Sequence, residues 1–190
     1  MALRITGGQL GGRTLRTPRG ASVRPTTGRV REALFSILGQ NLDDLSVLDL
    51  CAGAGTLGIE AGSRGASRVV FVEQGSDHLR VLRENAALLQ GHADIDVRRM
   101  DARRAPGLLS RQGETFDLVF LDPPYGRGLA LEVVQALAEV APTLLRSDAT
   151  VVAETESAAT LPETLGGLRR DEPRSYGDTK LWIYRADEAE

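Results

Sequence analysis

The stretch that decides the fold is Val47-Leu-Asp-Leu-Cys-Ala-Gly-Ala-Gly-Thr-Leu-Gly58. Its first residues form a short apolar run typical of a buried strand, and Gly53, Gly55 and Gly58 then have the G-x-G-x-x-G spacing. Between a strand and a helix, this spacing favours a loop that holds a nucleotide-type cofactor, because glycine lets the backbone approach a ligand closely. A tight turn without a ligand is the alternative.

Outward from this loop, apolar runs alternate with helical periodicity. The pattern predicts helices at 77–89 and 129–145, and an earlier helix that is capped by Thr26 or Thr27 and ends at Gly39. It predicts strands at 47–50, 69–73, 95–98, 116–121, 150–154, 167–174 and 179–184. We therefore expect an α/β, Rossmann-like, doubly wound sheet of seven strands, mostly parallel, with an antiparallel closing strand from the final hairpin.

Composition favours one catalytic domain. The chain has 190 residues, of which 42% are hydrophobic, enough for one substantial core. No apolar window approaches the roughly 20 residues of a membrane span, and no secretory signal is recognisable, so we expect a soluble, cytoplasmic protein. The single cysteine, Cys51, cannot form an intramolecular disulfide or a multi-cysteine metal site. We expect no metal.

The charge is unevenly distributed along the chain. Residues 1–31 contain seven arginines and no acid, whereas the remainder holds 16 basic and 26 acidic residues, a balance of −10. Arginine forks match phosphate geometry, and phosphate contacts supply much of the affinity for nucleic acid. We predict an arginine-rich RNA-binding arm or hairpin at 1–25, with Arg4, Arg13 and Arg16 as contacts, and a catalytic domain at 26–190. A solvated tail is the alternative.

Acidic residues at three successive strand ends indicate which cofactor the loop takes, since the glycine spacing alone also fits a dinucleotide dehydrogenase. Asp49 would repel a pyrophosphate but can hold the cationic amino-acid end of S-adenosylmethionine. Glu73 can accept both ribose hydroxyls, and Asp101 with the Ala102 amide can contact adenine. His78 and His92 are interpreted as surface residues. The predicted cofactor-binding residues are Asp49, Ala52, Gly53, Gly55, Thr56, Glu73, Asp101, Ala102 and Asp122.

The most specific signal is Asp122-Pro123-Pro124-Tyr125, directly after the strand at 116–121. Two prolines fix φ and remove two backbone donors, so the loop presents carbonyl oxygens rigidly beside a carboxylate and an aromatic ring. An exocyclic base amine is a poor nucleophile until acceptors engage its hydrogens. We assign catalysis to these four residues. The Asp122 carboxylate and the Pro123 carbonyl would accept the amine hydrogens, and Tyr125 would stack on the base. A proline-rich turn is the alternative.

Six motifs resemble one family along nearly the whole chain, the bacterial 16S ribosomal RNA (guanine(966)-N(2))-methyltransferases. They are Arg4-Ile-Thr-Gly-Gly8, Arg24-Pro-Thr-Thr-Gly-Arg-Val-Arg-Glu-Ala-Leu-Phe35, Leu48-Asp-Leu-Cys-Ala-Gly-Ala-Gly-Thr-Leu-Gly58, Phe71-Val-Glu73, Asp122-Pro-Pro-Tyr125 and Tyr176-Gly-Asp-Thr179. The sequence departs from the family at Gly28, where an acid is usual, and at Cys51 and Ala54.

The resemblance implies a class I methyltransferase fold and methyl transfer from S-adenosylmethionine, giving S-adenosylhomocysteine, to N2 of one guanine. The implied partner is 16S rRNA in the 30S subunit or a late precursor, with no membrane and no obligate protein partner. The resemblance also implies that Arg24, Thr26, Arg29 and Arg31 help to bind RNA.

Other functions remain open at this point. The tetrapeptide is shared with methyltransferases of DNA adenine and of protein glutamine, although a DNA enzyme would usually need a target-recognition insertion, which we do not find. From a different class, the chain could be a non-catalytic RNA-binding ribosome assembly factor.

Overall fold

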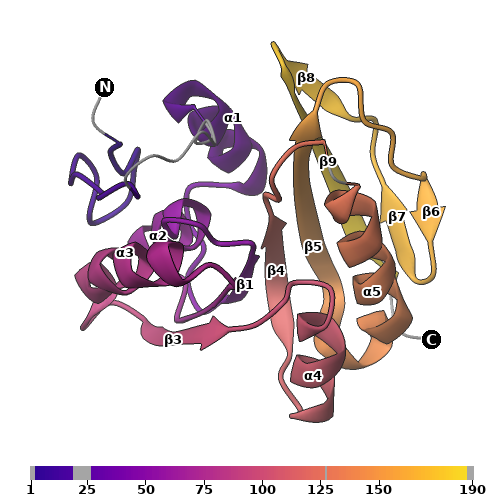
Figure 1. Ribbon diagram of the computed structural model, residues 1–190, viewed down its shortest axis with the longest axis horizontal. Helices are drawn as coiled ribbons and strands as arrows, with labels where there is room; N and C mark the ends of the chain where they lie inside the picture. The colour runs from indigo at the N-terminus through magenta and orange to yellow at the C-terminus, as the bar shows by residue number, and fades with distance from the viewer. Residues whose placement is uncertain (1–2, 19–26, 127, 188–190) are drawn as a thin grey trace. The chain divides into compact units, whose positions relative to one another are not determined.

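The computed structural model describes residues 3–18, 27–126 and 128–187 (Figure 1). The chain divides into two compact units, Met1–Arg99 and Met100–Glu190. The predicted boundary at residue 25 lies outside the described residues and stays a prediction. No helix in the described part of the chain is long and apolar enough to cross a membrane.

The first unit contains a parallel sheet in the order β3-β2-β1, formed by β1 (Ser46–Leu50), β2 (Arg68–Glu73) and β3 (Asp94–Arg99). All residues of β1 are buried, as are all of β2 except its first, which explains their continuous apolar sequences. The predicted strands at 47–50, 69–73 and 95–98 are confirmed to within one residue at each end. Parallel pairing brings the carboxyl ends of β1 and β2 to the same edge of the sheet.

Three α-helices accompany these strands: α1 (Gly28–Leu38), α2 (Thr56–Ser63) and α3 (Ser76–Ala86), the last continued by a 3-10 turn over Ala87–Leu89. The Thr27 hydroxyl caps α1 by accepting a hydrogen bond from the Val30 amide at 3.3 Å, and α1 ends at Gly39 as predicted. Helix α2 packs on β1 and β2, and α3 packs on β3. The cofactor-loop motif therefore joins β1 to α2.

In the second unit, β4 (Phe116–Leu121) pairs in parallel with β5 (Leu145–Glu156), which pairs antiparallel with β9 (Thr179–Ala186). The predicted antiparallel closing strand is thereby confirmed. The predicted strand at 167–174 is divided between β7 (Leu168–Arg170) and β8 (Arg174–Tyr176), both paired with β9, and β6 (Thr164–Leu165) pairs with β7. Two short strands thus add to the seven expected.

Helices α4 (Ala105–Arg111) and α5 (Leu129–Leu144) pack against each other, and α5 also packs on β5 (Figure 1). The predicted helix at 129–145 is confirmed. Helix α4 was not predicted, because it is seven residues long and has a proline in its first turn. Strand β4 leads directly into Asp122, so the predicted catalytic tetrapeptide, residues 122–125, follows the carboxyl end of a buried strand.

Candidate functional site

The predicted cofactor loop between β1 and α2 makes a sharp turn that includes left-handed backbone. Cys51, Gly53 and Gly55 have φ angles of 59°, 57° and 82°. The Ala52 amide donates to the Val72 carbonyl at 3.0 Å, which ties the loop to the end of β2, and the Gly55 amide donates to the Ala52 carbonyl at 2.7 Å. Ala52 is buried, and Thr56 is the first residue of α2.

The three glycines serve different purposes. A Cβ on Gly55 would lie 2.5 Å from the Leu82 side chain, and one on Gly58 would collide with Phe71, so protein packing requires both glycines. A Cβ on Gly53 would meet nothing closer than the Cys51 carbonyl oxygen, at 4.0 Å. Packing within the protein is therefore a sufficient reason for glycine at positions 55 and 58, and contact of Gly55 with the cofactor stays a prediction. Only Gly53 has open space beside its Cα, which fits close approach of a cofactor.

Asp49 is 2% exposed, and its carboxylate accepts a hydrogen bond from the Gly58 amide at 2.8 Å. The carboxylate therefore holds the first turn of α2 against the end of β1. Burial raises the pKa of Asp49 to about 7, with a smaller contribution from the charge of Glu73. A cation bound beside Asp49 would favour its ionised form.

Glu73, at the end of β2, closes the other side of the loop. One carboxylate oxygen accepts from the Gly53 amide at 2.8 Å, and the other accepts from the Gly75 amide at 2.6 Å. The structure thus brings Glu73 and the glycine loop together, as expected for a ribose-binding carboxylate. The Nδ1 atom of His78 lies 3.8 Å from Glu73, a proximity that the surface interpretation of this histidine missed.

Asp101 and Ala102 precede α4 in the second unit. Both Asp101 oxygens are engaged by Arg103, through its amide at 2.9 Å and its guanidinium at 2.6 Å. The hydrogen bonds from Arg103 lower the pKa of Asp101, so this carboxylate is ionised at neutral pH. Ala102 is buried. A contact of these two residues with adenine stays a prediction.

Exposure to solvent differs along the predicted catalytic tetrapeptide: Asp122 is half-buried, Pro123 is buried, Pro124 is exposed and Tyr125 is 43% exposed. It borders a cavity of 230 Å³ in the second unit, whose lining includes Pro123, Pro124, Glu154 and Glu156. The loop therefore offers a rigid backbone and an accessible aromatic ring beside a hollow with acidic groups.

The Tyr125 ring is held in place by its hydroxyl group. That hydroxyl donates to the buried Glu154 carboxylate at 3.2 Å and lies 3.1 Å from the Thr179 hydroxyl. Burial raises the pKa of Tyr125 to about 12, so the phenol stays neutral. Sequence reasoning missed Glu154 and placed Thr179 only within a motif, because their contact with residue 125 depends on the pairing of β5 with β9.

The N-terminal segment, residues 3–18, folds back on itself and packs within the first unit. Backbone bonds join Ile5 to Arg13 and Leu15 to Leu3, at 2.9 and 2.8 Å. The side chains of Ile5, Leu10 and Leu15 are 2–3% exposed. Of the two predicted alternatives, arm or hairpin, the described residues form a hairpin-like segment with an apolar anchor.

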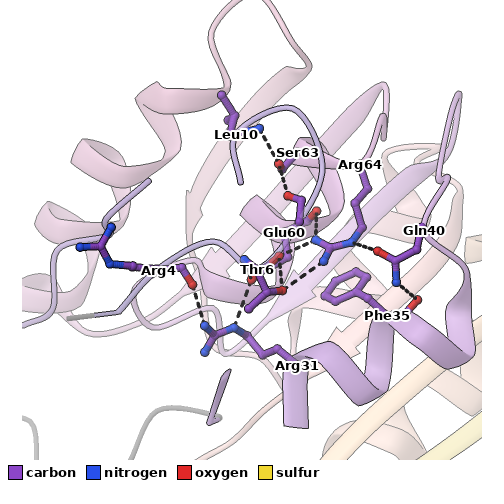
Figure 2. A network of polar contacts seen from close by, with 10 residues as sticks. Arg4, Thr6, Leu10, Arg31, Phe35, Gln40, Glu60, Ser63 and Arg64 are labelled. Atoms are coloured by element: carbon purple, nitrogen blue, oxygen red, sulfur yellow. Dashed lines mark hydrogen bonds and ion pairs between the residues drawn. The ribbon is translucent and has the colours of Figure 1, made fainter. Parts of the chain in front are cut away.

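A buried carboxylate, Glu60 on α2, fastens this segment (Figure 2). Glu60 is 0% exposed, and its oxygens accept from the Thr6 amide at 2.8 Å, from Arg31 Nε at 3.2 Å and from the Arg64 guanidinium. The same Arg31 guanidinium donates to the Arg4 carbonyl at 2.7 Å. Arg31 is 2% exposed, so its guanidinium faces Glu60 in the interior and its evident role is to hold residues 4–6.

The other predicted RNA-binding residues lie at the surface or outside the described residues. The arginines at 4, 13, 16 and 29 are exposed, whereas Arg24 and Thr26 lie outside the described residues. The Arg16 side chain is 74% exposed and its guanidinium lies 2.5 Å from Glu84, a surface pair that a phosphate group can displace.

Comparisons with known proteins show which family the chain resembles. A family model described as conserved hypothetical protein 95 matches residues 3–185. The Escherichia coli K12 protein named Ribosomal RNA small subunit methyltransferase D is 37% identical over 186 residues, which cover 97% of this chain and 90% of that protein. The Haemophilus influenzae protein of the same name is 34% identical over 158 residues, 81% of this chain and 79% of that one.

Among solved structures, one described as "Putative methyltransferase yhhF from Escherichia coli" matches with a TM-score of 0.81 and 32% identity, covering 100% of both chains. This match confirms the predicted Rossmann-like methyltransferase fold. The named relatives confirm the resemblance to a ribosomal RNA methyltransferase family.

Proposed function

The chain belongs to the family described as conserved hypothetical protein 95, and we propose that it transfers the methyl group of S-adenosylmethionine to the exocyclic N2 amine of one guanine in 16S ribosomal RNA. The Escherichia coli relative, which matches this chain nearly end to end, is named Ribosomal RNA small subunit methyltransferase D. The proposed substrate is the 30S subunit or a late precursor, and the proposed place of action is the cytoplasm.

The observation that carries the proposal is the tetrapeptide at the end of β4, with the Tyr125 ring anchored on Glu154 and Thr179. A fixed, half-exposed aromatic ring supports stacking of a base that has left its helix. In the proposed reaction, the Asp122 carboxylate and the Pro123 carbonyl accept the two amine hydrogens, and the nitrogen lone pair becomes available. The N–C bond would form as the S–C bond breaks, with S-adenosylhomocysteine as the leaving group, and the Asp122 carboxylate would pass the proton lost by the amine to solvent. Single-stranded or hairpin RNA supplies such an unstacked base more readily than duplex DNA.

Cofactor binding is assigned to residues of the first unit. When bound, S-adenosylmethionine supplies an electrophilic methyl group on its sulfonium. Glu73 would accept the ribose hydroxyls, the open side of Gly53 admits the ligand, and Asp49 balances its cationic amino-acid end. We also propose that Ala52, Gly55 and Thr56 of the loop bind the cofactor, with Asp101, Ala102 and Asp122 of the second unit as further proposed contacts.

RNA binding is assigned to the arginine-bearing N-terminal segment. Exposed Arg4, Arg13, Arg16 and Arg29 are proposed to contact phosphates, because unpaired or weakly paired surface arginines exchange counterions for phosphate. Arg31 is proposed to support this surface from within. The proposed roles of Arg24 and Thr26 rest on the family resemblance alone.

The test compares Asp122→Asn with a matched control, Asp117→Asn. Asp117 lies in β4, and its carboxylate forms an ion pair with Arg146 at 2.5 Å. Methyl transfer to unmodified 30S subunits is measured at saturating S-adenosylmethionine, because Asp122 is also a proposed cofactor contact, and it is expected to fall by about a hundredfold or more in Asp122→Asn. The control should retain transfer. Normal turnover in Asp122→Asn, or a wild-type protein that binds cofactor yet methylates no RNA, would contradict the proposal.

A further inference from the structure

One buried amide connects the N-terminal segment to the cofactor loop. Asn85, on α3, is 2% exposed. Its side-chain oxygen accepts from the Arg16 amide at 2.9 Å, and its side-chain nitrogen donates to the Arg16 carbonyl at 2.9 Å and to the Ala54 carbonyl at 2.8 Å. Ala54 stands between the two left-handed glycines of the loop. Asn85 therefore uses both of its donors and its acceptor to bridge the two segments.

A second set of contacts joins the same segment to α2, the helix that begins where the loop ends. The Ser63 hydroxyl accepts from the Leu10 amide at 2.9 Å and donates to the Gly7 carbonyl at 2.6 Å. Glu60, one turn earlier, binds Thr6. The N-terminal segment is thus attached at its beginning and middle to α2, and near its end to the loop through Asn85.

We propose that Asn85 is a positioning residue for the cofactor loop, and that residues 3–18 hold this loop through it in the shape that binds S-adenosylmethionine. The inference rests on the proposed function, because it takes residues 51–56 as the cofactor loop. Left-handed backbone at Cys51, a residue with a side chain, persists only where surrounding contacts fix it, and Gly53 and Gly55 leave the turn flexible unless it is held; the Asn85 bond to Ala54 lies between these two glycines.

The consequence is that RNA contact and cofactor affinity are linked. If RNA binding orders the N-terminal segment further, the loop becomes more ordered as well, and the affinity for the cofactor rises. Bound cofactor must then raise the affinity for RNA by the same factor by which RNA raises the affinity for the cofactor. The segment is therefore part of the cofactor site rather than a separable arm, and its removal should weaken cofactor binding as well as RNA binding.

The test uses Asn85→Asp in the full-length protein. This near-isosteric change keeps the oxygen that accepts from Arg16 but replaces the amide nitrogen by an oxygen facing two carbonyls. The matched control is Asn41→Asp, at an exposed asparagine whose side-chain oxygen only accepts from the Asp43 amide. We expect the S-adenosylmethionine Kd to rise about tenfold or more in Asn85→Asp, and to stay unchanged in the control.

A second readout needs no cofactor. Hydrogen exchange of the amides in residues 51–56 should be faster in ligand-free Asn85→Asp than in wild type, with exchange in β4 and β5 unchanged. If Asn85→Asp does not fold, Asn85→Ser removes the side-chain amide, and with it the bond to Ala54, without adding charge and is judged by the same criteria. Unchanged exchange in residues 51–56 and unchanged cofactor affinity, alongside a lower melting temperature, would overturn the inference in favour of a purely structural role.

The proposed function and the role of Asn85 can be refuted by different results. A wild-type protein that binds no S-adenosylmethionine would refute the proposed function, whereas the exchange comparison between the ligand-free proteins still decides whether Asn85 holds the loop.

Discussion

Cofactor affinity should depend on pH through Asp49. Burial raises the pKa of this carboxyl to about 7, so in the free protein Asp49 is half protonated at neutral pH. The cationic amino-acid end of S-adenosylmethionine is expected to bind the ionised form. Because Asp49 must lose its proton before it pairs with the cationic end of the cofactor, the affinity for S-adenosylmethionine should rise as the pH increases towards about 7.

The magnitude follows from the ionised fraction. From about pH 6 to about pH 7 this fraction grows from about one tenth to about one half, so the Kd should fall about fivefold. This window lies below the range in which an α-amino group itself loses its proton. Calorimetry at the two pH values, in two buffers of different ionisation heat, should also show release of about half a proton at pH 7.

Two variants complete the experiment. Asp49→Asn keeps an oxygen to accept from the Gly58 amide but cannot ionise, so the pH dependence and the proton release should disappear. Asp44→Asn, in an exposed loop, should behave as wild type. A Kd that is flat between the two pH values in wild type, or a slope that persists in Asp49→Asn, would refute the role given to the Asp49 carboxylate.

Three further predictions concern other parts of the molecule. Because the pKa of Asp49 is raised, the folded state keeps a proton that the unfolded chain releases. The free energy of unfolding should therefore fall by up to about 4 kcal/mol as the pH rises from about 4 to about 7. Thermal unfolding of Asp49→Asn should lack this pH dependence. Tyr125→Phe keeps the ring but loses the hydrogen bond to Glu154. In steady-state assays kcat should fall about tenfold, with the Kd for the cofactor unchanged. An unaltered kcat would count against a role for this hydrogen bond in holding the ring. Glu60→Ala leaves two buried arginines without their carboxylate and should lower the free energy of unfolding in urea by about 3–5 kcal/mol. Arg16→Ala, at the surface, should lower it by less than about 1 kcal/mol. The same variant should reduce the slope of log affinity for RNA against log salt concentration by about 1.

Much of the fold was predictable because its signals are local. Buried parallel strands such as β1 and β2 are continuous apolar runs, and α5 carries four turns of amphipathic periodicity. Helix α4 lacks such a signal, since seven residues complete barely two turns. Strands β6 and β8, of two and three residues, pair with the next strands along the chain, β7 and β9, and are too short to be recognised from their own composition.

In the candidate site too, features formed by contiguous residues could be predicted, whereas contacts between residues far apart in sequence could not. The glycine loop and the tetrapeptide are contiguous in sequence and were predicted, but the purpose of Gly55 and Gly58 depends on Leu82 and Phe71, which the sequence does not place beside them. Likewise, Arg31 belongs to an arginine-rich stretch that suggested RNA contact. Its buried partner Glu60 lies 29 residues away, and such long-range pairs have no sequence signature in a single chain.

Identification of the modified nucleoside tests the central claim most directly. Wild-type protein and labelled S-adenosylmethionine are incubated in parallel with unmodified 30S subunits, naked 16S RNA and duplex DNA, and the products are digested and identified by mass. We predict N2-methylguanosine, confined to one position of 16S RNA, with no label in DNA. A methylated adenine in DNA, or cofactor binding without label in any nucleic acid, would contradict the proposed function.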